Sequence, residues 1–234
     1  SLNDTKEAYK KLIAATDELV KSQFIEMFGR TETVTSNLLA LPSYEIRELY
    51  DVKSSKRIYA KELTTSGIPF LKVGDVLERI NTGESHPTVF ISEQKYCELK
   101  ESGLVPKAGD ILVTSRGTIG KCYILADDDA FYFQDGMISW LKAKCDCRLL
   151  PEFTAALFAE EGFLKTLDEV TNKTTVTYIS LDKLAGLKVI CPPEEKQREY
   201  LDFLRQSDKS KFELEQALAE LNATYKRIIA ENLG

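Results

Sequence analysis

The first residues of the chain alternate apolar and polar positions with the period of a helix. Along residues 3–28, apolar or small side chains return at steps of four and three, the spacing of a seam between two packed helices. The positions of this seam are Tyr9, Ile13, Thr16, Val20, Phe24 and Met27. Gly29 follows and is typical of a helix C-terminus. The pattern therefore predicts an amphipathic helical segment over residues 1–29.

The last residues show the same behaviour over a greater length. Behind Pro192 and Pro193, which are typical of a helix start, the chain predicts one helix over residues 194–234. Polar Ser207 and Lys211 interrupt its apolar stripe, as polar residues often do where helix register is fixed. An uncovered stripe of this length must pack on another element. Its apolar members are Tyr200, Leu204, Leu214, Leu218, Leu221, Tyr225 and Ile228.

The two helical segments also end alike. Aligning their ends pairs Ile13 with Leu218, Val20 with Tyr225 and Gly29 with Gly234. The coincident endings suggest a repeated unit of helix and globule. Two unrelated amphipathic helices are the alternative interpretation.

Between the helices, the period of the pattern changes. Residues 30–43 are rich in Thr, Ser and Asn and predict a linker, whereas residues 44–193 contain short apolar runs bounded by turn residues. The runs predict strands at 46–52, 69–73, 111–114, 122–126, 137–142 and 187–191, and helices at 92–101, 151–160 and 163–170. We therefore expect an α+β protein, with one mixed α/β domain over 44–193 flanked by long amphipathic helices.

Composition narrows the class of protein. The formal charge of −6 argues mildly against a non-specific nucleic-acid binder, although specific binders can gather their cations on one face. No apolar run approaches the roughly 20 residues that span a bilayer. The five cysteines lack the spacing of a disulfide framework, which favours reduced thiols in a cytoplasmic protein, and we expect no metal at the Cys145–Cys147 pair.

A glycine-rich turn stands at the centre of the middle segment. The run Ile111 to Val113 predicts a buried strand, and residues 114–121 follow it with two glycines, three hydroxyls and two cations. Such a turn can present amides, hydroxyls and Arg116 to an anionic partner. It has neither the GxxxxGK[ST] nor the GxGxxG spacing of a nucleotide-binding loop. A purely structural corner is the alternative.

Three stretches in fixed order resemble a known family. They are residues 67–76 (GIPFLKVGDV), the glycine turn at 109–121, and residues 179–197, which lead directly into the last helix. This order is similar to that of the target recognition domain of DNA specificity (S) subunits from type I restriction–modification systems. The resemblance covers essentially the whole chain.

The resemblance implies separate roles for the recognition domain, the helices and the partner subunits. In that family a subunit usually carries two recognition domains, and two conserved helices pair as an antiparallel coiled coil that docks methyltransferase subunits. This chain resembles half of such a subunit, either a natural half-length form or a fragment. The resemblance implies that the apolar stripe from Tyr200 to Ile228 is a homodimerisation surface. It further implies double-stranded DNA, modification subunits and the restriction subunit as partners, with S-adenosylmethionine bound by the methyltransferase rather than by this chain.

Two departures from the family pattern stand out. Many relatives have Asn-Gln where this chain has Phe133, Gln134 and Asp135, and many have a glycine-led loop where it has residues 172–177. The second difference lies in a region expected to face DNA, so it could alter the sequence that is read.

Recognition of a DNA site needs cations and amides on phosphates, and side chains on base edges. Three polar, turn-rich patches could supply both, and their residues are our candidate DNA contacts. The first patch holds Lys53, Ser55, Lys56, Arg57 and Tyr59; the second holds Thr114, Ser115, Arg116, Thr118 and Lys121; the third holds Asn172, Lys173 and Thr174. A solvated loop is the alternative for each cation taken singly.

Catalysis has little support in the sequence. The one histidine, His86, precedes a proline in a polar loop, and Asp127 to Asp129 are most simply a solvated turn. Nucleophile elbow, zinc-protease and Walker motifs are missing, as are the motifs of an adenine methyltransferase. The leading hypothesis is a non-catalytic DNA-recognition and scaffold subunit. The alternative is a coiled-coil interaction module with a ligand-binding globule, which an acidic or apolar face over the three patches would favour.

Overall fold

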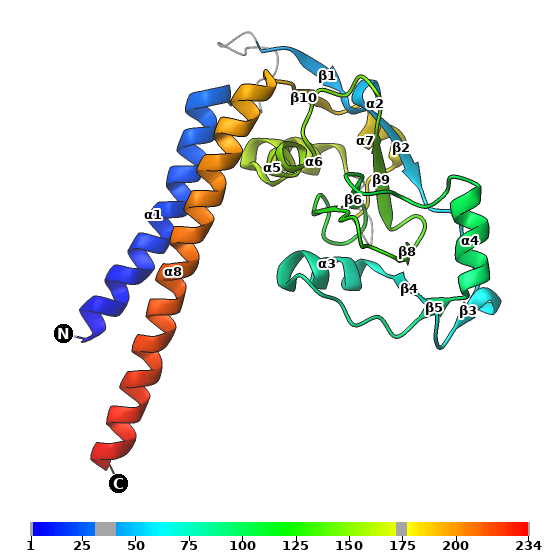
Figure 1. The fold of residues 1–234 in the computed structure, drawn as a ribbon. Helices are drawn as coiled ribbons and strands as arrows, with labels where there is room; N and C mark the ends of the chain where they lie inside the picture. Colours follow the sequence, from blue (N-terminus) through cyan, green and yellow to red (C-terminus); the bar gives the residue numbers. More distant parts are fainter. Residues whose placement is uncertain (1, 31–40, 172–176, 234) are drawn as a thin grey trace. The chain divides into compact units, whose positions relative to one another are not determined.

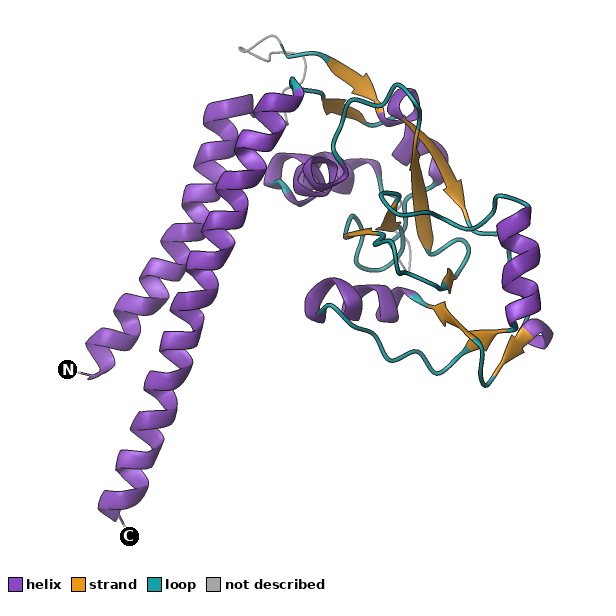
Figure 2. Cartoon of the chain, viewed as in Figure 1, coloured by secondary structure: helices purple, strands orange, loops and turns teal. Residues whose placement is uncertain are grey.

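The computed structural model describes residues 2–30, 41–171 and 177–233, and divides into two compact units. One unit comprises Ser1–Gly29 with Glu195–Gly234, and the other comprises Arg30–Glu194. The first is all helical and the second mixes helices and strands, which confirms the predicted α+β class (Figure 2).

The helical unit consists of α1 (Leu2–Phe28) and α8 (Glu194–Leu233), which run antiparallel (Figure 1). At one end, the Tyr200 ring meets the rings of Phe24 and Phe28 edge-on, with centroids 5.4 and 5.6 Å away. Further along, Lys211 Nζ lies 2.7 Å from Asp17 Oδ1. Near the other end, Lys6 Nζ lies 4.2 Å from the centre of the Tyr225 ring.

These contacts show what covers the apolar stripe of α8. The stripe from Tyr200 to Tyr225 packs along α1 of the same chain, while Ile228 stays 45 % exposed. The two polar interruptions fit this pairing, because Ser207 is buried and Lys211 forms an ion pair with α1. Pairing with a second copy is therefore not needed to cover the stripe, and homodimerisation stays a prediction.

The mixed unit is built on three small sheets. Two strands, β1 (Ser43–Glu45) and β10 (Lys188–Ile190), pair antiparallel. A four-stranded sheet has the order β2-β9-β6-β7, with β2 (Tyr50–Ser54), β9 (Ile138–Ala143), β6 (Ile111–Thr114) and β7 (Cys122–Ile124). The last has the order β3-β5-β4-β8, with β3 (Leu63–Thr64), β5 (Phe90–Ile91), β4 (Ile68–Leu71) and β8 (Tyr132–Phe133).

Short helices connect these strands. They are α2 (Ile46–Leu49), a 3₁₀ turn (Ala60–Glu62), α3 (Val73–Thr82), α4 (Glu93–Glu101), α5 (Pro151–Ala159), α6 (Glu161–Val170) and α7 (Leu181–Ala185). The helices predicted at 92–101, 151–160 and 163–170 are confirmed by α4, α5 and α6. Ser92 caps α4, because its Oγ accepts a hydrogen bond from the Lys95 amide (3.2 Å).

One local prediction was wrong, and several short elements were not predicted. The strand predicted at 46–52 begins as helix α2, since Ile46 and Leu49 are both buried one helical turn apart, and the chain becomes extended only from Tyr50. Helix α3 was not predicted at all. Its start is capped by Asp75, whose carboxylate accepts from the Lys72 amide (2.7 Å), and Gly83 ends it at φ +83°.

A buried cluster of the mixed unit includes residues of the β2-β9-β6-β7 sheet. Leu112 and Trp140 meet Leu71, Val76 and Phe133 in one buried cluster. The Trp140 indole donates to the buried Asp110 carboxylate (2.9 Å), so the largest side chain of the core has its polar atom satisfied. Because the core holds this sheet rigid, the loops at its ends project from fixed positions.

Candidate nucleic-acid interface

The sheet brings the first two polar patches to the same end. Strand β9 pairs antiparallel with β2 on one side and with β6 on the other, so β2 and β6 run parallel (Figure 1). Their C-terminal residues, Ser54 and Thr114, lie opposite Ser139 and Ile138 at the start of β9. The loops that follow β2 and β6 therefore leave one end of the sheet, separated by one strand.

The loop after β2 presents most of the first patch. Lys56, Arg57 and Tyr59 are exposed, while Ile58 between them is buried and anchors the loop. The Lys56 amide donates to the Tyr132 hydroxyl (2.8 Å), and the Arg57 guanidinium lies 5.8 Å from the centre of the Tyr59 ring. Burial raises the pKa of Tyr132, so this hydroxyl stays protonated at neutral pH. The loop backbone is thus held while its cations remain on the surface.

The loop after β6 is the glycine turn. The Gly120 amide donates to Thr114 O (2.8 Å) and the Lys121 amide donates to Thr114 Oγ1 (3.0 Å), which closes the turn on itself. Gly117 and Gly120 have φ of +75° and +84°, which a residue with a Cβ adopts only at a cost. Arg116, Thr118 and Lys121 are exposed on this turn.

Three predicted contacts lie inside the protein. The Ser115 hydroxyl is 4 % exposed and hydrogen-bonds Ser139 Oγ (2.6 Å), and Thr114 is fully buried. Ser55 is 8 % exposed, and its Oγ has no hydrogen-bond partner among the described residues. We therefore remove these three hydroxyls from the candidate contacts. Thr114 and Ser115 instead hold the turn in shape.

Of the remaining first-patch residues, Lys53 is exposed on β2. Its Nζ lies 3.7 Å from Asp51 and 5.8 Å from the centre of the Trp140 ring. Its charge is thus partly matched on the strand itself.

The third patch, Asn172, Lys173 and Thr174, lies outside the described residues. The chain is described again from Thr177, and this segment hydrogen-bonds the glycine turn. The Gly117 amide donates to Thr177 O (3.0 Å), and the Ile179 amide donates to Ser115 O (3.0 Å). Tyr178, 38 % exposed, forms an isolated bridge with Arg116. Tyr178 was not among the predicted contacts, although it is an aromatic residue beside a predicted DNA-facing loop.

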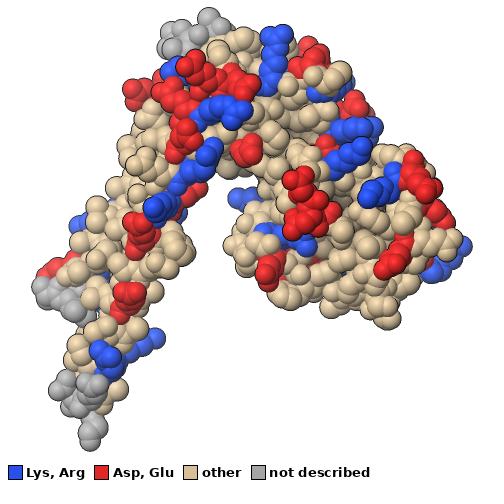
Figure 3. Space-filling view, viewed as in Figure 1, with Lys and Arg blue, Asp and Glu red and all other residues tan. Residues whose placement is uncertain are grey.

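Charge does not gather into one field on the face drawn in Figure 3, where Lys and Arg alternate with Asp and Glu. This agrees with the net charge of −6. On this face, an affinity for DNA would thus depend on individual cations rather than on a broad basic surface.

The candidate catalytic groups have structural partners. The Glu78 carboxylate hydrogen-bonds the His86 ring at 3.1 Å, which raises the pKa of His86 and lowers that of Glu78. The expected solvated turn at 127–129 holds an ion pair, since Asp129 binds Arg79 and accepts from the Tyr123 hydroxyl (2.7 Å). That expectation was wrong for Asp129, whose side chain is 8 % exposed.

Across residues 2–30, 41–171 and 177–233, three or more His, Cys, Asp or Glu side chains nowhere gather as they would around a metal ion. Over the same ranges, every helix is too short or too polar to cross a membrane.

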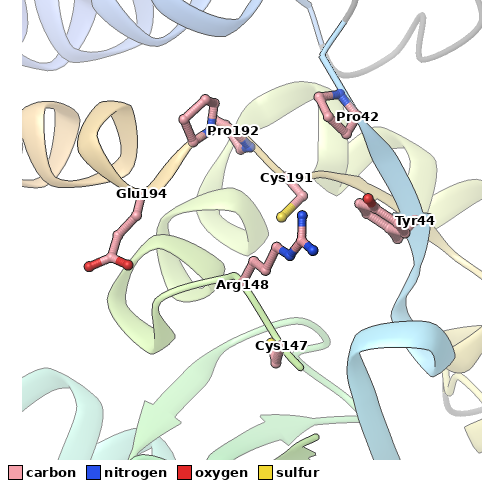
Figure 4. A pocket seen from close by; sticks show the side chains of 8 residues that line it. Pro42, Tyr44, Cys147, Arg148, Cys191, Pro192 and Glu194 are labelled. Atoms are coloured by element: carbon pink, nitrogen blue, oxygen red, sulfur yellow. The ribbon is translucent and has the colours of Figure 1, made fainter. Parts of the chain in front are cut away.

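A cavity of about 420 Å³ lies elsewhere in the mixed unit (Figure 4). Arg148 stands in it between the thiols of Cys191 and Cys147, with the Tyr44 ring at one wall. Burial raises the pKa of the Cys191 thiol, which lowers its reactivity. The segment with Cys147 and Arg148 follows the C-terminal end of β9, opposite to the end that carries the polar loops. The cavity is therefore separate from the candidate interface.

Comparison with known proteins shows the family to which this chain belongs. Residues 42–223 match the model of the type I restriction modification DNA specificity domain. The chain belongs to this family. A protein named as a type I restriction enzyme specificity subunit, from Haemophilus influenzae, is 29% identical over 163 residues, which are 68% of this chain and 38% of that protein. This chain thus spans well under two thirds of that relative's length.

Solved structures share the fold. A chain from a type I R-M system studied for its assembly and conformational transition superposes with a TM-score of 0.68 at 18% identity, over 97% of this chain and 53% of that one. The HsdS subunit of Thermoanaerobacter tengcongensis gives 0.67 at 16% identity, over 98% and 53%. The S subunit from M. genitalium gives 0.53 at 13% identity, over 97% and 56%. The type I specificity fold therefore accounts for nearly the whole chain, which covers about half of each of these subunits.

Proposed function

We propose that this chain is the DNA-recognition and scaffold part of a type I restriction–modification complex and reads one half of a bipartite target. The observation that carries this proposal is the convergence of separate polar loops at one end of a rigid sheet. Loops from distant parts of the sequence, after β2, after β6 and after residue 176, meet around the start of β9. Because the chain belongs to a family of DNA specificity domains, DNA is the partner that we propose for this surface.

The two contact types can be assigned to different residues. Lys56 and Arg57 on one loop, and Arg116 and Lys121 on the other, would neutralise phosphates. Tyr59, 59 % exposed on the first loop, and Tyr178, which is bridged to Arg116, offer aromatic faces. Thr118 is an exposed hydroxyl beside Arg116, and the third patch, with Lys173, stays a proposed contact. Four phosphate contacts would give log K a slope of about −3.6 against log salt concentration, since each contributes about −0.9.

The helical unit offers a docking surface for methyltransferase subunits. A groove of about 300 Å³ between its helices is lined by Thr16, Leu19, Phe203, Gln206, Ser207 and Ser210. Leu19 in this lining is 53 % exposed, and Leu12, seven residues earlier on α1, is 52 % exposed. Exposed leucines on α1, with Phe212 58 % exposed on α8, favour a protein partner, and the family indicates a methyltransferase subunit.

Catalysis would belong to those partners. They would bind S-adenosylmethionine and extrude the target base, because a base inside the stack cannot reach an active site. In this proposal the chain itself is not an enzyme and binds no cofactor. The restriction subunit would join the same assembly.

Self-association is the remaining part of the proposal. Two copies would restore the two recognition domains of a full-length subunit, and their stripes would meet only if α1 leaves the seam, because Phe24 and Phe28 already cover Tyr200. Light scattering at micromolar concentration tests this. We expect twice the 26.4 kDa mass of one chain, and the mass of a single chain would contradict self-pairing.

The experiment that tests the proposed function is a methylome comparison. The cognate modification subunit is expressed with and without this chain, and methylated adenines are mapped by single-molecule sequencing. We expect a new split motif that appears only with the chain. A stable complex with the modification subunit but no new motif would refute DNA reading, and absence of any complex would refute the scaffold role.

A further inference from the structure

A loop with one acidic residue and no basic residue lies between the two basic loops. It spans residues 134–137 and leads from β8 into β9. The Gly136 amide donates to Ser54 Oγ (3.1 Å), and the Ser115 amide donates to Met137 O (2.9 Å). Since β9 is the strand between β2 and β6, its incoming loop is held at the centre of the interface.

Two side chains of this loop are uncommitted. Gln134 and Asp135 are partly exposed, and neither side chain hydrogen-bonds or forms an ion pair with any residue in the described part of the chain. The backbone beneath them is fixed, because the Gln134 amide donates to Leu71 O (2.9 Å). An amide and a carboxylate thus stand on consecutive residues of a fixed backbone, with their hydrogen-bonding capacity unused within the described residues.

The dimensions suit one groove of DNA. Neighbouring strands lie about 4.8 Å apart, so the loops after β2 and β6 are separated by about 10 Å with this loop midway. The major groove of B-DNA is about 12 Å wide. Long cationic side chains on the outer loops would reach the phosphates at both edges of a groove while the middle loop faces its floor.

The carboxylate indicates which atoms it would meet. Phosphates repel a carboxylate, so Asp135 is out of place against the backbone of DNA. On the major-groove floor, the amino groups of cytosine and adenine are the donors that a carboxylate can accept from, and a glutamine amide pairs with adenine through two hydrogen bonds.

We propose that Gln134 and Asp135 are base-reading residues, and that Asp135 selects a base that presents an amino group in the major groove. This inference rests on the proposed function, because it places these residues on bound DNA.

The test uses the full chain in complex with its modification subunit and compares methylation motifs. Asp135→Asn and Gln134→Ala are measured beside the control Arg57→Ala. We expect Asp135→Asn to lower the preference for one base pair of the motif by about 5- to 150-fold, the range of one good base contact, while the other positions keep theirs. Arg57→Ala should lower methylation evenly without changing the motif.

The outcomes separate the two proposals. If the unmodified chain directs no motif, the proposed function fails and this inference fails with it. If the unmodified chain directs a motif that Asp135→Asn and Gln134→Ala both keep with full selectivity, only this inference is overturned. Should Asp135→Asn abolish methylation, competition with duplexes changed at one position each decides. An equal loss on every duplex overturns base reading, and a loss confined to one position supports it.

Discussion

The glycine turn offers the sharpest test of how the interface is supported. A Cβ added at Gly120 would lie 2.5 Å from Leu167 Cδ2 on α6, whereas one added at Gly117 would meet nothing within 4 Å. Both positions have positive φ, so alanine costs about 1–2 kcal/mol at either. Leu167 is 2 % exposed and has little room to move, so Gly120→Ala should cost a further 1–3 kcal/mol or so through overpacking. Gly117→Ala is therefore the matched control.

The assay is urea unfolding followed by the fluorescence of Trp140, the single tryptophan, which is buried in the same unit. With an m-value of about 2 kcal/mol/M, an extra 2 kcal/mol moves the midpoint by about 1 M relative to Gly117→Ala. Adding Leu167→Ala to Gly120→Ala should cost less than the sum of the single changes, because the truncated side chain clears the space. Equal midpoints for the two alanine variants, or strict additivity with Leu167→Ala, would refute the packing argument.

Three further predictions concern charge and the helical unit. Arg57→Ala should reduce the salt dependence of specific DNA binding by about 0.9 in slope, measured by titration at several salt concentrations; an unchanged slope would remove Arg57 from the phosphate contacts. Phe24→Ala should destabilise the helical unit by about 3–5 kcal/mol, because the ring is 1 % exposed and packs against Tyr200. Far-UV circular dichroism should show a lower melting temperature for this variant. The control Leu19→Ala, at an exposed site, should leave the melting temperature nearly unchanged. The NMR titration of His86 should give a pKa above 6.5 that Glu78→Gln lowers. Because the folded pKa is raised, this pair stabilises the fold below about pH 6.5 and the contribution fades as pH rises through the folded pKa; a titration that Glu78→Gln does not move would contradict it.

Much of the fold could be predicted because its signals are local. The seams of α1 and α8 repeat over many turns, and the run Ile111 to Val113 is apolar without interruption. Short segments were harder. In residues 46–52, Tyr50, Asp51 and Val52 alternate as in a strand, and the burial of both Ile46 and Leu49 marks the helical turn before them. Helix α3 carried readable signals, the capping Asp75 and the terminating Gly83, yet Gly74 near its start weakened them.

The residue types of the candidate interface could be predicted from the sequence, but the exposure of each side chain could not. The patches were recognised as polar and turn-rich, and the structure does bring the first two together. However, the burial of Thr114 and Ser115 depends on the neighbouring strand β9, where Ser139, 24 residues away from Ser115 in the sequence, hydrogen-bonds the Ser115 hydroxyl. For the same reason Gln134 and Asp135 were noted only as a departure from a family pattern. Their central position follows from the pairing of β9 with two strands, which is a long-range property.

The separation of buried and exposed polar groups explains how such an interface can vary. The Ser115 and Ser139 hydroxyls hydrogen-bond each other, and the Thr114 hydroxyl accepts from the Lys121 amide, so removal of one hydroxyl leaves a partner unpaired and costs about 1–3 kcal/mol. Exposed Arg57 and Thr118, in contrast, can change with effects within about 0.5 kcal/mol on stability. A chain built this way can exchange the residues that would contact DNA without disturbing the sheet that positions them. Recognition would then change through the loop surface alone, while the docking of partner subunits, on a different compact unit, would be left intact.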